Sequence, residues 1–182
     1  MEKLLCPVCK KNMALVGSSL RCESSHSFDL AKEGYVNLLT GSKAGAATGD
    51  NKDMARCRKS FLDKGYFEPL AKGLCDIINR EKASTVLDIC CGEGYYAEYI
   101  SRNTSAAVYG FDLSKEMVRL AAKRKSKVRF LLQICPLYQS VTALRTVQFT
   151  CLHRFAKRNL HGLCVKAVTL SAFARVKLTC GR

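Results

Sequence analysis

The stretch Val86-Leu87-Asp88-Ile89-Cys90-Cys91-Gly92-Glu93-Gly94-Tyr95-Tyr96 decides the fold of this chain. Its apolar residues predict a buried strand over 86–89, and a helix is expected over 95–102. Gly92 and Gly94 allow backbone N–H groups to approach a ligand where a Cβ would clash. A helix that begins directly behind the turn favours a polar or anionic group there. This pattern is typical of the first strand–helix crossover that holds a nucleotide-type cofactor in a doubly wound sheet.

A second strand and a second helix follow, so the strand–helix alternation continues. The pattern predicts a strand over 107–111, closed by Asp112, and a helix over 115–125 with Ser114 as its N-cap. An acid at the end of the second strand is placed to accept hydrogen bonds from both ribose hydroxyls of a nucleoside. Residues 128–130 begin a third strand, and residues 54–79 are mostly helical. The predicted fold class is therefore α/β and Rossmann-like.

Four potential metal ligands stand near the N-terminus, at Cys6, Cys9, Cys22 and His26. The pattern C-x2-C-x12-C-x3-H brings two soft ligands from each of two short turns to one tetrahedral Zn²⁺. The step between the pairs can hold a hairpin with its tip at residues 17–19. A redox C-x-x-C and scattered buried thiols are the alternatives, but a redox motif expects a strand before it. The spacing favours structural zinc.

The composition indicates the cellular compartment in which the protein is expected. No apolar run approaches the ~18 residues that span a bilayer, and the first residues lack the apolar core of a signal peptide. The chain is therefore expected in the cytoplasm, with its eleven cysteines as reduced thiols or metal ligands.

The charge is distributed unevenly along the chain. All fifteen acidic residues lie between Glu2 and Glu116, whereas Met117 to Arg182 holds fourteen Lys and Arg residues and no acid. With ordinary usage of ~25% charged residues, such a run is very improbable, so the C-terminal third is unusual.

Two cofactors compete for the glycine loop, which we define as residues 90–94. Gly92-x-Gly94-x-x-Ala97 satisfies the loose dinucleotide pattern, so NAD is an alternative. Asp88 directly before the loop suits a cationic amine or sulfonium better than a pyrophosphate. The acids Asp88 and Glu93 therefore favour S-adenosylmethionine and a methyltransferase, with a dinucleotide enzyme and a non-catalytic α/β fold as alternatives.

The chain resembles the bacterial 23S rRNA (guanine-N1)-methyltransferases over residues 4–130. The resemblance is carried by the four ligand positions, the glycine loop, and the segments at 28–39, 49–50, 55–70 and 111–115. It implies zinc at Cys6, Cys9, Cys22 and His26. It also implies S-adenosylmethionine at residues matching Phe67, Gly92 and Glu93. The expected cofactor site is completed by Asp88, Cys90, Gly94 and Asp112, from the loop and the ends of the two strands. Cys90 departs from the family, which usually has glycine there.

The resemblance also implies an activity and partners. The expected reaction is S-adenosylmethionine-dependent methylation of guanine N1 in a hairpin of 23S rRNA, where a base can be splayed out of the stack. The zinc module and the basic surface would position the RNA through its phosphates, and a homodimer is possible by family resemblance. No residue is identifiable as the catalytic proton acceptor, so the catalytic residues are unknown.

After Phe130 the resemblance ends. Residues 131–182 suggest either translation in the wrong reading frame, giving a frameshifted or truncated copy, or a natural basic arm of the kind that binds nucleic acid. Read one base out of frame, residues 156–168 resemble a late methyltransferase segment, E-x-x-R-V-(x)2-G-G. With only two to three sheet strands encoded, the strands at 86–89 and 107–111 are expected to lack neighbours, and little or no activity is expected.

The predicted organisation has four parts. Residues 1–39 form the zinc module with its docking segment, and 40–83 form a linker and helical connector. Residues 84–130 form the N-terminal half of an incomplete class I methyltransferase domain, and 131–182 form a basic tail of unrelated sequence. The alternative function is a non-catalytic zinc-dependent RNA-binding protein.

Overall fold

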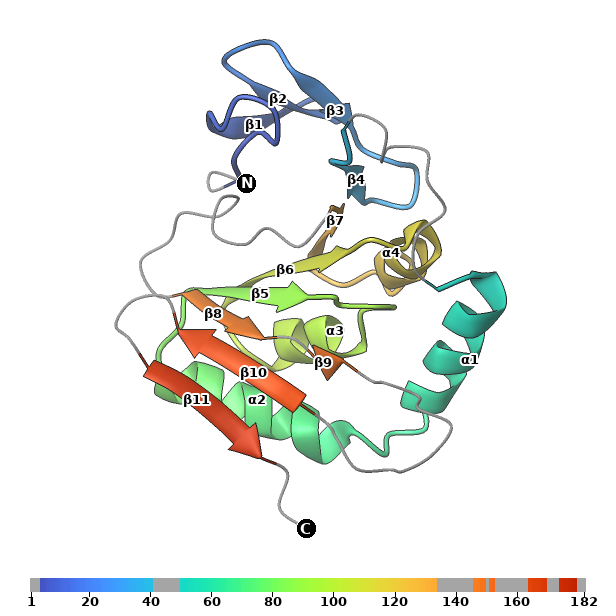
Figure 1. The fold of residues 1–182 in the computed structure, drawn as a ribbon, viewed down its shortest axis with the longest axis vertical. Helices are drawn as coiled ribbons and strands as arrows, with labels where there is room; N and C mark the ends of the chain where they lie inside the picture. Colours follow the sequence, from blue (N-terminus) through green and yellow to red (C-terminus); the bar gives the residue numbers. More distant parts are fainter. Residues whose placement is uncertain are drawn as a thin grey trace.

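The computed structural model describes residues 4–40, 50–133, 146–149, 151–152, 164–169 and 174–179 of the 182-residue chain. A small N-terminal sheet lies beside a larger sheet that carries helices (Figure 1). Within these residues, no helix combines the length and the hydropathy that a membrane crossing requires. Residues 41–49, within the linker predicted from Thr40 to Asn51, lie outside the described residues.

The small sheet is the antiparallel meander of the zinc module. It consists of β1 (Met13–Val16), β2 (Ser19–Cys22) and β3 (Ser27–Asp29) in the order β1-β2-β3. Leu15 pairs with Leu20 across the turn, and Gly17 in that turn has φ +60°. This confirms the hairpin predicted between Cys9 and Cys22.

The large sheet contains the predicted strand–helix alternation. β5 (Thr85–Ile89) leads into α3 (Tyr95–Asn103), β6 (Ala107–Asp112), α4 (Lys115–Ala122) and β7 (Arg129–Leu132). β5, β6 and β7 are parallel neighbours, as expected of a doubly wound sheet. The Ser114 side chain accepts a hydrogen bond from the Met117 N–H, which confirms the predicted cap. α4 ends at Ala122, three residues earlier than predicted, and Lys125 just beyond it adopts φ +50°.

The docking segment of the zinc module joins this sheet as an edge strand. β4 (Val36–Asn37) pairs in parallel with β7, with Val36 opposite Leu131. Arg119 on α4 also donates to Glu33 of the same segment at 2.8 Å. The segment thus contacts the sheet through both a strand pairing and an ion pair.

Both faces of the central strands are buried, and each face belongs to a different core. Val86, Val108 and Phe130 point to the helical side and pack with residues of α2 (Glu68–Arg80), α3 and α4. The alternate residues pack against the zinc module. This second core joins Leu87, Ile89, Tyr109, Phe111 and Leu131 to Leu4, Cys6, Met13, Leu20 and Cys22. Such double burial explains why these strands are almost continuously apolar.

Two helices connect the zinc module to the sheet. α1 (Lys52–Leu62) packs beside α4, and α2 packs beside α3 (Figure 1). Asn51 caps α1 by accepting from the N–H groups of Asp53 and Met54. Pro69 stands in the first turn of α2, where a missing N–H costs nothing.

The expectation that β5 lacks a neighbour is wrong. β8 (Thr146–Phe149) pairs with it in parallel on the side opposite β6, and all five residues of β5 are buried. β10 (Cys164–Thr169) then pairs antiparallel with β8, and β11 (Ala174–Thr179) and β9 (Cys151–Leu152) pair with β10. The sheet order is β11-β10-β8-β5-β6-β7-β4.

Candidate functional site

The glycine loop turns the chain sharply between β5 and α3. The Cys91 N–H donates to the Phe111 carbonyl at 2.9 Å, and the Gly92 N–H donates to Asp112 Oδ2 at 2.8 Å. Cys90 and Gly92 adopt φ +61° and +56°, in the left-handed region. The loop is thus held at the ends of the first two parallel strands, where open α/β sheets bind their ligands.

Gly94 is required by packing. It adopts φ +83° as the N-cap of α3, and a Cβ there would lie 2.8 Å from the Ala121 Cβ and 2.9 Å from Phe130 Cζ. Any side chain would separate α3 from α4 and β7. Gly94 therefore sets the position of the helix behind the loop.

A small pocket opens beside this loop. We term it the loop pocket; its lining consists of Arg58, Leu62, Asp88, Cys90, Cys91, Gly92, Glu93, Tyr95 and Tyr96. The lining combines two aromatic side chains, two acids, the backbone of the turn and Arg58, whose charge is paired with Asp50. This mixture suits a ligand with a flat ring and a positive charge.

Asp88 is the most unusual group in the pocket. Its side chain is 2% exposed, and its Oδ2 has no hydrogen-bond partner among the described residues. Burial raises the pKa of Asp88 well above its ordinary value, and the nearby carboxylates of Asp112 and Glu93 raise it further. A hydrogen bond from the Ala97 backbone acts in the opposite direction, but a buried carboxylate with one oxygen left unpaired is still a costly arrangement in the free protein. A cationic ligand in the pocket would lower that cost.

Asp112 is held by the backbone around it. Its Oδ2 accepts from Gly92 and its Oδ1 accepts from the Ser114 N–H at 2.8 Å. Burial raises its pKa, and these backbone donors act in the opposite direction. Each carboxylate oxygen keeps a second lone pair, so the side chain can still accept from ligand hydroxyls.

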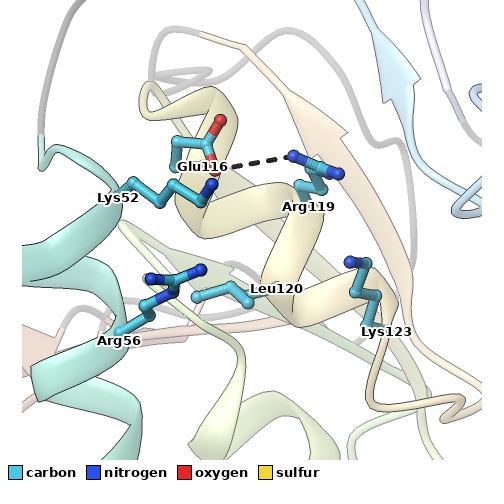
Figure 2. A pocket seen from close by; sticks show the side chains of 6 residues that line it. All are labelled: Lys52, Arg56, Glu116, Arg119, Leu120 and Lys123. Carbon is cyan, nitrogen blue, oxygen red and sulfur yellow. Dashed lines mark ion pairs between the residues drawn. The ribbon is translucent and has the colours of Figure 1, made fainter.

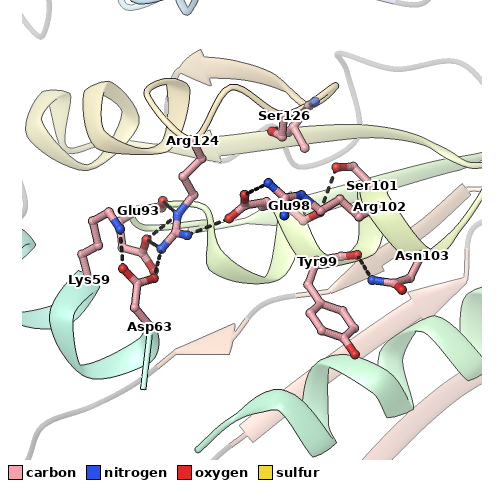
Figure 3. Close-up of polar contacts among 11 residues, drawn as sticks. Lys59, Asp63, Glu93, Glu98, Tyr99, Ser101, Arg102, Asn103, Arg124 and Ser126 are labelled. Carbon is pink, nitrogen blue, oxygen red and sulfur yellow. Dashed lines mark hydrogen bonds and ion pairs between the residues drawn. The ribbon is translucent and has the colours of Figure 1, made fainter. Parts of the chain in front are cut away.

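Glu93 is tied to a buried arginine (Figure 3). Arg124 donates through Nε to both the carbonyl and Oε2 of Glu93 at 2.8 Å, and its Nη2 also contacts Oε2. The same guanidinium donates to Glu98 at 2.6 Å and to Asp63 at 2.8 Å. Burial acts to lower the pKa of Arg124, but these three carboxylates more than offset it and raise the pKa. Arg124 thereby fixes the glycine loop to α1 and α3.

The structure distributes the expected cofactor residues unevenly. Asp88, Cys90, Gly92 and Glu93 line the loop pocket. Gly94 and Asp112 border the turn but are not in the pocket wall, and Phe67 lies at the start of α2 with its ring 5.8 Å from that of Phe61.

Arg58 is a pocket residue that sequence reasoning missed. Its guanidinium pairs with Asp50 at 2.7 Å, and it shares one face of α1 with Leu62, four residues on. The i, i+4 spacing of these two residues was the available signal.

The second candidate site is the metal quartet of the zinc module. The ligand atoms of Cys6, Cys9, Cys22 and His26 all lie within 4.8 Å of one another. Cys9 and Cys22 Sγ are 3.5 Å apart, and His26 Nδ1 lies 3.7 Å from Cys6 Sγ and 3.3 Å from Cys22 Sγ. A tetrahedral zinc site with bonds of ~2.0–2.3 Å has edges of ~3.3–3.8 Å, so the quartet fits zinc.

Comparison with known proteins assigns both sites to known modules. Residues 4–43 match the family model for the N-terminal zinc ribbon of RlmA, and residues 86–171 match a methyltransferase-domain model. The plantazolicin methyltransferase BpumL, solved with SAH, is 17% identical with a TM-score of 0.40, covering 56% of this chain and 53% of its own. The two family-model matches correspond to a zinc ribbon followed by a methyltransferase domain, and the parallel strands β5, β6 and β7 with their helices agree with the second match.

Two curated proteins show which methyltransferases this chain is similar to. The chain is 36% identical over 125 residues to the 23S rRNA (guanine(748)-N(1))-methyltransferase of Streptomyces fradiae, and 34% identical over 129 residues to YxjB of Bacillus subtilis. These matches cover 66% and 65% of this chain. The chain is related to the 23S rRNA (guanine-N1)-methyltransferases, and it spans about 44–45% of the length of these two relatives.

Proposed function

We propose that this chain binds S-adenosylmethionine in the loop pocket and serves in methylation of guanine N1 in 23S rRNA. The observation that carries the proposal is Asp88, a buried acid with an unpartnered oxygen beside a glycine turn. A dinucleotide would bring a pyrophosphate toward this carboxylate, whereas S-adenosylmethionine brings positive charge.

The residues around the pocket suggest separate roles. Asp112 would accept from the ribose hydroxyls, and Asp88 would face the positively charged methionine portion. Tyr95 and Tyr96 supply aromatic surface, and the Gly92 backbone allows close approach. The bound cofactor supplies an electrophilic methyl group, and the protein aligns it with the attacking nitrogen. Phe67 and Gly94 remain candidate contacts from the family resemblance. No described residue is assigned as proton acceptor.

The RNA partner follows from the relatives that methylate 23S rRNA. We propose a hairpin substrate, with zinc held by Cys6, Cys9, Cys22 and His26 to keep the zinc module folded against the sheet. A protein acting on rRNA would work in the cytoplasm. The homodimer expected from the family remains part of the same proposal.

Calorimetry with S-adenosylhomocysteine tests the cofactor assignment. The intact zinc-loaded chain should bind it, and Asp88→Asn should bind more weakly. Lys72→Ala, at an exposed position of α2 outside the pocket lining, should not change the affinity. Binding of NAD in place of S-adenosylhomocysteine would refute the proposal. Mass spectrometry of a 23S rRNA hairpin after incubation with S-adenosylmethionine then measures methyl transfer.

The division of the chain into four parts also stays a proposal. The methyltransferase-domain match extends to residue 171, beyond Phe130, and β8 lies in that region. The frameshift hypothesis predicts that the gene, read in the other frame after the Phe130 codon, encodes acids and methyltransferase motifs. Early stop codons in that frame would eliminate it.

A further inference from the structure

A second concave site lies between α1 and α4. Its wall consists of Lys52, Arg56, Glu116, Arg119, Leu120 and Lys123, and we term it the basic hollow. Figure 2 shows Lys52 and Arg56 extending from α1, and Arg119 and Lys123 rising from α4. Four cations from two helices therefore border one hollow that contains a single carboxylate.

The cations of the hollow differ in how far they are neutralised. Arg119 is paired with Glu33 at 2.8 Å and, more loosely, with Glu116 at 3.8 Å. Arg56 has only a 3.9 Å contact with Asp53, whose side chain is 89% exposed. Among the described residues, Lys52 and Lys123 have no ion-pair partner. Lys123 acts on Glu33 only through its longer-range charge, so two lysines on opposite sides of the hollow have ammonium groups without a direct ion pair and can bind a ligand.

The chemistry of the hollow fits a phosphate group. Lysine ammonium groups act as point charges toward phosphate, and a weakly paired arginine can add directed N–H donors. Leu120 contributes the one apolar side chain, too little to hold an apolar ligand. A charged, polar hollow of this kind is typical of contacts to a nucleic-acid backbone.

The hollow is linked to the loop pocket by one helix. Lys52 and Arg56 of α1 line the hollow, whereas Arg58 and Leu62 of the same helix line the loop pocket. With a rise of ~1.5 Å per residue, Arg56 and Leu62 are about 9 Å apart along the helix. A backbone held in the hollow would therefore run close to the cofactor site.

We propose that the basic hollow binds a phosphodiester group of the RNA substrate and so positions the RNA along α1. The inference rests on the proposed function, because it takes the ligand to be the RNA that is methylated. It adds a specific anchoring site, formed by Lys52, Arg56 and Lys123, to the family's general preference for RNA.

Fluorescence anisotropy with a labelled 23S rRNA hairpin tests this, using the intact zinc-loaded chain over a range of salt concentrations. The variants are Lys52→Ala, Lys123→Ala and the pair, with Lys72→Ala as the exposed control. Each lost phosphate contact should lower the salt slope by ~0.7–0.9, which corresponds to about 5- to 8-fold weaker binding at 0.1 M salt relative to 1 M. Single-stranded DNA of the same sequence should lose affinity equally, because the contact is to phosphate.

The outcomes separate this inference from the proposed function. Calorimetry with S-adenosylhomocysteine should give the same affinity for all four variants as for the unaltered chain. If the double variant binds RNA with an unchanged salt slope, the hollow does not bind a phosphodiester group, and the proposed function still stands. Absence of RNA binding by the unaltered chain would overturn both. If the double variant loses binding to polyglutamate but binds RNA as before, the hollow binds an acidic protein and not RNA.

Discussion

Replacing Cys90 with glycine should stabilise the protein. Cys90 adopts φ +61° at the first position of the glycine loop, in the left-handed region that favours glycine. A residue with a Cβ pays roughly 1–2 kcal/mol for the left-handed conformation. Glycine avoids that cost but gains about 0.5–1 kcal/mol of extra chain entropy in the unfolded state. The net expectation is a gain of about 0.5–1 kcal/mol in the free energy of unfolding.

Cys90 is exposed at the rim of the loop pocket, so its replacement by glycine leaves no buried cavity. In a chain of this size, ~1 kcal/mol shifts the midpoint of thermal unfolding by about 2–4 °C. Calorimetric melting of the zinc-loaded protein measures this directly. Affinity for S-adenosylhomocysteine should also increase, since the missing Cβ lets the ligand approach more closely.

Cys90→Ala is the matched control. It removes the thiol but keeps the Cβ, so the backbone cost stays and the melting temperature should change little. If Cys90→Ala stabilises the protein as much as Cys90→Gly, the gain comes from the thiol and the reasoning from backbone strain is wrong. A lower melting temperature for Cys90→Gly would refute it as well.

Three further changes test the remaining features of the site. Asp88→Asn should weaken S-adenosylhomocysteine binding about 10- to 100-fold, the loss of a charged hydrogen bond of ~1.5–3 kcal/mol. Because burial raises the folded-state pKa of Asp88, its contribution to stability is present below the unfolded pKa of ~3.9 and is lost as the pH rises through the folded value. Asp88→Asn should therefore raise the unfolding free energy more at pH 7 than at pH 5 in urea titrations, and an equal change at both would contradict this. Arg124→Met should cost about 3–5 kcal/mol, since it leaves Glu93 buried without its partner, and adding Glu93→Gln should recover part of the loss in a double-mutant cycle. Chelation of zinc should expose the sheet face covered by the zinc module, seen as faster amide exchange in β5 and β6, and unchanged exchange there would disprove the packing argument.

Local spacing was sufficient to predict much of this molecule. The metal quartet needs only two short turns, and β5, the glycine loop and α3 follow from one contiguous stretch. Asp112 could be placed because parallel strands end at the same edge of a sheet. In each case, the decisive residues lie within about one supersecondary unit of each other.

Contacts between distant segments could not be predicted in the same way. Nothing in the local pattern of residues 4–22 indicates that they cover Leu87 and Phe111, which come much later in the chain. The role of Arg124 was equally hidden, because its three carboxylate partners come from α1, the loop and α3. The parallel pairing of β8 with β5 was missed because residues 146–149 lie in a stretch with no recognisable α/β rhythm.

The edge strand β4 has a consequence for the order of folding during synthesis. The four zinc ligands leave the ribosome first, so the module can bind metal and fold alone. β4, however, must wait for β7, which is made roughly 90 residues later. At 5–20 residues per second, that delay is about 5–20 s. During this interval the apolar face of the module is exposed, because the sheet that it covers has not yet been made. Early zinc binding keeps the module folded and so reduces misassembly.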